Sequence, residues 1–172
     1  MAPLRTSHGV NAGLSMSIDQ EICAFLNREA RYMDEGRYQE WLNLWSDELI
    51  YWVPCGGEEA DPRTAVSIIY DDRTRLVQRV ERLMSGTVLA VEPSLRMRRV
   101  VSNIDIISQA EDTVAVESNF MLGVAHRGGP QVWVGRSRHD LRRIAPTDYR
   151  IRQKRVDLIN ADQELPLLQF LI

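Results

Sequence analysis

The sequence predicts an α+β fold, a cone-shaped half-barrel in which a strongly curved antiparallel sheet holds three helices from the N-terminal half in its concavity. Apolar residues recur with a helical period up to about residue 86 and with a strand period from about residue 96. The second half divides into four strand-like runs with short hairpin-like connections between them. Each run has about a dozen residues, whereas strands average about 5–6, so the sheet must bend strongly to fit one domain.

One domain of ordinary size accounts for this pattern. The chain has 172 residues, of which 44% are hydrophobic, and this is enough for a sizeable core. Residues 1–16 mix Gly, Ser, Asn and Pro without a period. We therefore expect a flexible N-terminal arm over residues 1–16 and a single domain over residues 17–172.

The first two helices are predicted from apolar spacing and from end signals. Ser17 and Gln20 form a capping box, and the helix that follows ends at Gly36, which readily adopts a left-handed conformation. The second helix is short, and its mostly aromatic face indicates a structural cluster, because each large ring buries about 150–250 Å². The first face holds Ile22, Phe25, Leu26, Glu29, Ala30 and Met33, and the second holds Tyr38, Trp41, Leu42 and Trp45.

The remaining elements follow in order. "ELIYWVP" (48–54) is predicted to be a strand that stops at Pro54, and "SIIY" (67–70) a short strand. Asp71 or Asp72 caps a third helix, which ends at Gly86. Four strands then span residues 96–160, and "QAED", "HRGGP" and "IAPTD" connect them.

Composition argues against two classes of partner. The net charge is −3, and the basic residues form no stripe that could neutralise phosphates, so we expect no nucleic-acid partner. No apolar run approaches the roughly 20 residues that span a bilayer, and the N-terminus lacks the apolar region of a secretory signal. We therefore expect a cytoplasmic protein without a membrane partner.

We expect no metal ion in this chain. A Rieske cluster needs two cysteines and two histidines at short spacings, and a mononuclear iron site needs two histidines and a carboxylate. His8 lies in the predicted arm, His126 at a hairpin tip and His139 in a strand, so neither set can be assembled. Cys23 and Cys55 are far apart in the sequence and are expected to be free thiols.

A cavity at the open end of the cone could support acid–base chemistry, because a buried carboxylate or histidine there would have a shifted pKa. Each candidate also has a structural interpretation: solvated charge at a helix end, core packing of a tyrosine, or hydrogen bonding within the sheet. The candidates are Tyr32, Asp34, Tyr51, Asn103 and His139.

Four segments identify a family resemblance. "FLNREARYMDEGRYQEWLNLWSDELIYWVP", "DDRTRLVQRVERLMSG", "EPSLRMRRVVSNIDI" and "KRVDLINAD" occur in this order and at suitable spacing. Together they resemble the β (small) subunits of aromatic-ring-hydroxylating dioxygenases, the Rieske non-haem iron oxygenases. The similarity runs from about residue 18 to the C-terminus, and it implies a cone-shaped fold like that of nuclear transport factor 2 and scytalone dehydratase.

The resemblance also implies a function. It implies a structural subunit that supports a catalytic α subunit in a hetero-oligomer, usually α3β3 with contacts between β subunits in a trimer. The α subunit would hold a 2Fe–2S Rieske cluster and mononuclear Fe(II), with electrons from NADH supplied through reductase components. The complex would cis-dihydroxylate an arene in aromatic hydrocarbon catabolism, and no catalytic residue is implied for this chain.

Two other functions stay open from the residues alone. One is a stand-alone dehydratase, isomerase or cyclase that uses an Asp or His base in the cone. The other is a module that binds a small hydrophobic ligand without reaction. A cone filled by the chain's own side chains would argue against both.

Two features suggest subunit contacts. Lys154 is the only lysine among 21 Lys and Arg residues, and guanidinium groups suit bidentate pairing at interfaces. The C-terminal segment is almost wholly apolar, so it packs either inside the domain or against another chain. The predicted interface residues are Arg96, Arg98, Arg99, Leu168, Phe170 and Leu171; the alternative for the arginines is a solvated strand face.

Overall fold

A computed structural model describes residues 16–56, 59–85, 95–125, 129–166 and 168–172. Within these ranges the helices are α1 (Ile18–Asp34), α2 (Tyr38–Leu42) and α3 (Arg73–Met84). The strands are β1 (Trp45–Pro54), β2 (Ser67–Asp71), β3 (Met97–Gln109), β4 (Thr113–Val124), β5 (Gln131–Ala145) and β6 (Asp148–Leu158). Residues 1–15 of the predicted arm and Gly86 lie outside the described residues.

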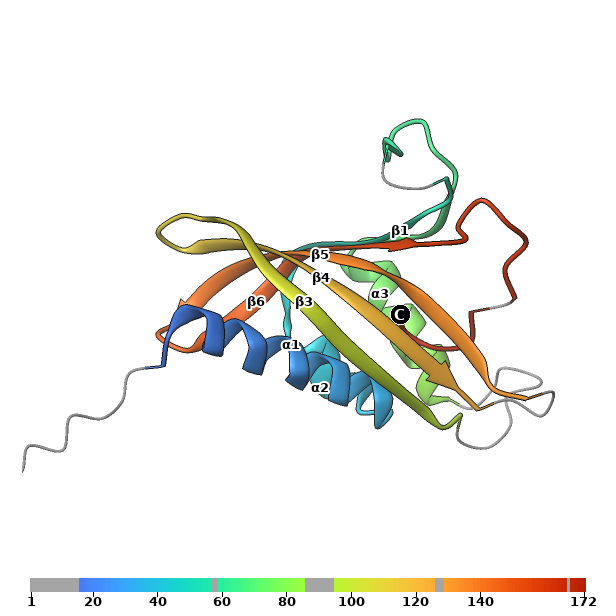
Figure 1. Ribbon diagram of the computed structural model, residues 1–172, viewed down its shortest axis with the longest axis horizontal. Coiled ribbons are helices and arrows are strands. Elements are labelled where there is room, and N and C mark those ends of the chain that lie inside the picture. Colours follow the sequence, from blue (N-terminus) through green and yellow to red (C-terminus); the bar gives the residue numbers. More distant parts are fainter. Residues whose placement is uncertain (1–15, 57–58, 86–94, 126–128, 167) are drawn as a thin grey trace, which may run out of the picture.

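The strands form one curved, open sheet in the order β2-β1-β6-β5-β4-β3 (Figure 1). This confirms the predicted α+β half-barrel. All neighbouring pairs are antiparallel except β1 and β6, which are parallel. The sheet is thus antiparallel, as predicted, except at this pair. Hairpin connections fix the relative direction only of consecutive strands, and β1 and β6 are far apart in the sequence.

Bulges allow the long strands to curve. Between Ser102 and Asp105 the register of β3 shifts, so that Asn103 and Ile104 lie opposite the single residue Ser118 of β4. Asn103 has a φ of +50°, in the left-handed region that asparagine tolerates better than most residues. An extra residue of this kind bends a strand and increases its twist, which lets β3 wrap around the helices.

The helices match the sequence signals, with one difference. Ser17 Oγ accepts a hydrogen bond from Gln20 N, and Gln20 Oε1 accepts one from Ser17 N, which completes the predicted capping box. Helix α2 ends at Leu42 instead of continuing through Trp45. Trp45 begins β1 because it pairs with Ile151 of β6, whose N–H donates to the carbonyl of Leu44 at 2.8 Å.

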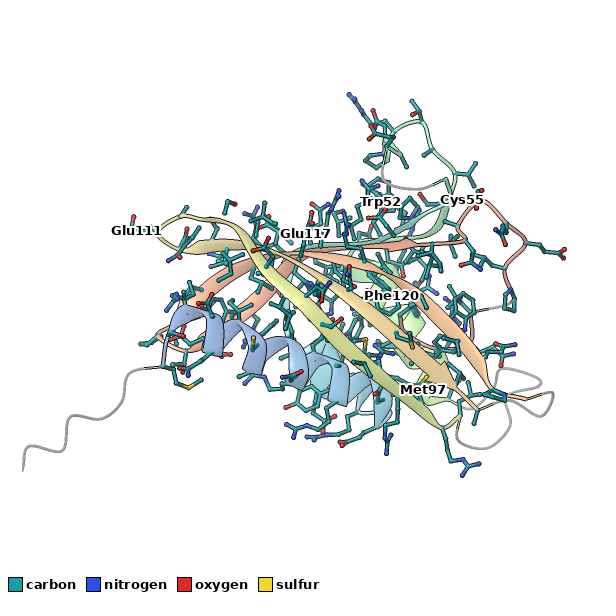
Figure 2. The ribbon with its side chains drawn as sticks, viewed as in Figure 1. Trp52, Cys55, Met97, Glu111, Glu117 and Phe120 are labelled. Carbon is teal, nitrogen blue, oxygen red and sulfur yellow. The ribbon has the colours of Figure 1, made fainter. Side chains whose placement is uncertain are left out.

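The core fills the space between sheet and helices. Along β4 the side chains alternate, and those that face the helices are buried; Figure 2 shows Phe120 among them. Trp41, Trp45 and Tyr51 pack edge to face, with ring centroids 5.3–6.0 Å apart. These contacts confirm that the aromatic stretch is structural.

The C-terminal segment is part of this core. Phe170, Leu171 and Ile172 are 4%, 0% and 3% exposed, and Phe170 packs edge to face on Trp133 at 5.6 Å. Their side chains are therefore covered by the chain itself. Of the two alternatives for Phe170 and Leu171, this burial supports packing inside the domain, because the segment returns into the concavity.

Candidate functional site: a buried ion-pair network

A carboxylate lies in the interior of the cone. Glu29 is only 3% exposed because it occupies the core-facing side of α1, in line with Ile22 and Met33. Its Oε1 accepts hydrogen bonds from Trp41 Nε1 at 3.2 Å and Lys154 Nζ at 2.8 Å. Its Oε2 lies 3.0 Å from His139 Nε2. Glu29 thus connects α1, α2, β5 and β6.

A bulge in β6 directs Lys154 inward. His139 of β5 and Lys154 of β6 are cross-strand partners, so their side chains lie on the same face. Strict alternation from Ile151 would place Gln153 inward, but the register shifts here, and Arg152 and Gln153 are both exposed. The shift brings Lys154 opposite Glu29.

The charges in this cluster stabilise one another. Burial by itself would raise the pKa of Glu29, but the charges and hydrogen bonds of Lys154 and His139 outweigh it and lower that pKa. Burial lowers the pKa of Lys154, and the charge of Glu29 opposes this shift. Since Glu29 is a carboxylate, His139 carries a proton on Nε2; its Nδ1 is buried without a partner among the described residues.

A second buried pair lies nearby. Arg99 Nε is 2.9 Å from Asp34 Oδ1, with side chains 4% and 8% exposed, and the backbone N–H of Arg99 donates to Asp34 Oδ2 at 2.8 Å. Burial lowers the pKa of Arg99, and Asp34 opposes this shift. Arg99 Nη2 also donates to the carbonyl of Leu171 at 2.8 Å. This guanidinium therefore ties α1, β3 and the C-terminal segment together.

Tyr51 holds the same segment from the other side. Its hydroxyl donates to the carbonyl of Ile172 at 2.6 Å and accepts from the Ile172 N–H at 3.1 Å. The ring is 0% exposed, and burial raises the pKa of the phenol. The hydroxyl is thus used in packing the chain end, not in contact with an open cavity.

The space beside the Glu29 network is small. A cavity of about 20 Å³ lies beside Glu29, His139 and Lys154, with Ser118 and Ser137 in its wall. A water molecule needs about 10–15 Å³ on this measure, while the engineered cavity that holds benzene has about 150 Å³. The space can accommodate about one water molecule and is too small for a cyclic substrate.

The predicted pocket residues do not form one pocket. Asp34, Tyr51 and His139 all face the interior, but each is engaged as described above, and only His139 lines the cavity. Tyr32 is half-buried, with the guanidinium of Arg37 over its ring at 4.4 Å. Asn103 is exposed at the β3 bulge and does not line this cavity.

The predicted interface residues differ in their exposure to solvent. Arg96 and Arg98 are exposed, and Leu168 is half-buried. The side chain of Arg99, in contrast, is enclosed with that of Asp34.

Sequence reasoning missed Glu29 and Lys154 as members of a site. Two signals could have found them. Glu29 is the only polar residue on the apolar face of α1, and Lys154 is the only lysine in the chain. A lone charge on a core face requires a buried partner of opposite sign.

The described residues do not fit a Rieske cluster or a mononuclear iron site. Among them no group of three or more His, Cys, Asp or Glu side chains could hold a metal ion. Cys23 and Cys55 are free, as expected, and Cys55 Sγ donates to the carbonyl of Ala161. His8 and His126 lie outside the described residues. Within the part of the chain that is described, no helix is both long and apolar enough to cross a membrane.

Two curated relatives are similar to this chain in sequence. The chain is 34% identical over 145 residues to the small oxygenase component of the p-cumate 2,3-dioxygenase system of Pseudomonas putida. This match covers 76% of this chain and 79% of the relative. It is 34% identical over 105 residues to the 2-halobenzoate 1,2-dioxygenase small subunit of Burkholderia cepacia. That match covers 58% of this chain and spans only 64% of the relative's length.

Solved structures share the fold. The β subunit of benzoate 1,2-dioxygenase from Burkholderia mallei has a TM-score of 0.73 and 24% identity, covering 91% of this chain and 98% of that one. A putative scytalone dehydratase from Novosphingobium aromaticivorans has a TM-score of 0.60 and 12% identity, over 81% and 83% of the two chains. The scytalone-dehydratase-like fold is thus confirmed. The family of ring-hydroxylating β subunits matches residues 28–162, and this chain belongs to that family.

Proposed function

We propose that this chain is the structural β subunit of an aromatic-ring-hydroxylating dioxygenase in the cytoplasm. It supports a catalytic α subunit, which holds the Rieske cluster and mononuclear iron and receives electrons from NADH through reductase components. The assembled oxidoreductase cis-dihydroxylates an aromatic compound. An α3β3 assembly with contacts between β subunits is the stoichiometry that the family resemblance favours.

One observation supports the structural role. The interior of the cone, where a stand-alone enzyme of this shape would bind substrate, is occupied by the chain's own C-terminal residues and by the network around Glu29. The acidic and basic groups there bind one another, and about 20 Å³ is left beside them. This supports a subunit that acts by shape and docking.

Co-expression tests this proposal. The chain is produced with a Rieske-type α subunit from the same organism, and the mixture is separated by size-exclusion chromatography. We expect both chains in one complex that converts an arene to a cis-dihydrodiol when the reductase components and NADH are added. A chain that stays apart from α would contradict the proposal.

One observation favours the alternative function, a stand-alone enzyme that uses acid–base chemistry. His139 has a buried Nδ1 without a partner among the described residues, and its Nε2 contacts a carboxylate. If this were a catalytic base, the purified chain alone would turn over a small cyclic substrate, and Asp34→Asn or His139→Gln would abolish that turnover. We expect no turnover, because such a substrate does not fit the cavity.

A further inference from the structure

We propose that one end of the outer face of the sheet is the surface through which this chain binds its α subunit. The proposal rests on the proposed function and adds the location and chemistry of the contact. The surface, called the outer apolar patch below, consists of Val100, Met121, Val132, Val134 and Ile159.

The strand register brings these residues together. Val100 of β3 is the cross-strand partner of Met121 of β4, and Met121 is the partner of Val134 of β5. Ile159, just after β6, donates its N–H to the carbonyl of Val134 at 3.1 Å. Directly opposed side chains in a sheet have Cβ atoms about 4.5–5.5 Å apart, so the row is continuous across the sheet.

The patch is strongly exposed. Val100 is 65%, Met121 54%, Val132 62% and Ile159 74% exposed. These side chains point away from the helices, because the residues that alternate with them point inward and are buried. Figure 1 shows the helices gathered on one side of the sheet. Glu117, labelled in Figure 2, lies on the face of β4 that is opposite the helices, as Met121 does. A contiguous exposed apolar surface of this kind marks an interaction site.

A hollow adjoins the patch. It measures about 200 Å³ and is lined by Gln131, Val132, Trp133, Asn160 and Pro166. A cavity of about 150 Å³ is enough for a benzene ring. A partner can therefore insert an aromatic or leucine side chain beside Val132, which is how buried anchor residues act in protein interfaces.

The border of the patch on the β3 side is basic. Arg96 and Arg98 are exposed, and Arg98 lies opposite Gly123, next to the Val100–Met121 pair. Guanidinium groups at such a position bind carboxylates. The complementary surface on the partner has an apolar centre with one protruding aromatic or leucine side chain. Its carboxylates face Arg96 and Arg98. The inner face is closed to such a partner, because the helices and the C-terminal segment occupy it.

A second copy of this chain is the competing occupant. Exposed Asp162 and Glu164, in the turn after Ile159, could supply carboxylates to the arginines of another copy. We assign the patch to α, because α is the partner that the proposed function requires and because the exposed basic border of Arg96 and Arg98 suits a partner that carries carboxylates. The experiment separates the two occupants.

The test compares two double variants that alter the same two strands. Val100→Glu with Val132→Glu changes the patch on β3 and β5. Ile107→Glu with Ile144→Glu changes exposed apolar residues elsewhere on β3 and β5, which are 54% and 49% exposed. Each is co-expressed with the α subunit, the affinity for α is measured, and the isolated chain is sized and thermally unfolded. Because all four side chains are exposed, both variants should unfold at the wild-type temperature.

We expect the patch variant to lose about tenfold or more in affinity for α, since glutamates remove apolar contact and repel the partner's carboxylates. The control variant should bind like the wild type. Equal binding by both variants would overturn the assignment. So would a patch variant that still binds α but no longer forms the oligomer that the wild type forms alone. A wild-type chain that never binds α would refute the proposed function itself.

Discussion

Glu29 accepts hydrogen bonds in the core from donors on α2, β5 and β6, and its charge balances that of Lys154. Glu29→Gln leaves Lys154 buried without an anion, so we expect a loss of about 3–5 kcal/mol in the free energy of unfolding, measured in urea. Glu29→Met combined with Lys154→Met removes both charges and should cost less than the sum of the two single changes. A Glu29→Gln protein as stable as the wild type would contradict this account.

The same residue gives stability a defined pH dependence. The pKa of Glu29 is lowered in the folded state from its ordinary value of 4.5. Below about pH 4.5 the unfolded chain therefore binds more protons at this site, and stability rises with pH there. The contribution is complete above about pH 5 and is lost as the pH falls. The stability gap between wild type and Glu29→Gln, measured from about pH 3 to pH 7, should narrow in acid; a constant gap would refute this linkage.

At the level of elements, β4, β5 and β6 pack closely at one glycine. A Cβ at Gly135 would meet the carbonyl oxygen of Asp157 and, at 2.9 Å, the ring of Phe120. The backbone oxygen cannot move aside cheaply, so Gly135→Ala should destabilise the protein by about 1–3 kcal/mol in thermal or urea unfolding. Gly123→Ala is the control, because its Cβ would come no nearer than 3.8 Å to the carbonyl of Arg98. Equal stability of the two variants would show that the strands can separate at Gly135.

The C-terminal segment depends on side chains from other elements. Tyr51→Phe leaves the N–H and carbonyl of Ile172 without their shared partner, and we expect a cost of about 1–3 kcal/mol with faster amide hydrogen exchange over residues 168–172. Tyr70→Phe, on the neighbouring strand β2, is the control because Tyr70 is 39% exposed. Unchanged exchange in Tyr51→Phe would mean that packing of Phe170 and Leu171 holds the segment alone.

For the whole molecule, the interior serves stability and the outer face serves assembly. His139→Gln should therefore lower the unfolding temperature, while the dioxygenase activity per assembled complex stays at the wild-type level. The measurement is the cis-dihydrodiol rate, normalised to the amount of complex recovered by size-exclusion chromatography. A lower rate at equal assembly would give His139 a part in the chemistry and would favour an active interior.

Most elements could be predicted from the sequence, because their signals are local. The capping box at Ser17, the apolar face of α1 and the alternation in β4 each depend on residues within a few positions of one another. The site could be predicted only in part. His139 and Asp34 were recognised as interior candidates, but their partners Glu29 and Arg99 are distant in the sequence.

The sequence by itself determined the fold class, the helices of the first half, the long strands of the second and the family. Only the tertiary structure decided that β1 runs parallel to β6, that Phe170 and Leu171 return into the core, and that Lys154 faces Glu29. These are contacts between residues that are distant in the sequence, or consequences of a one-residue bulge in β6 that reverses which side chains point inward. Local periodicity predicts neither effect, because both arise when the sheet curves around the helices.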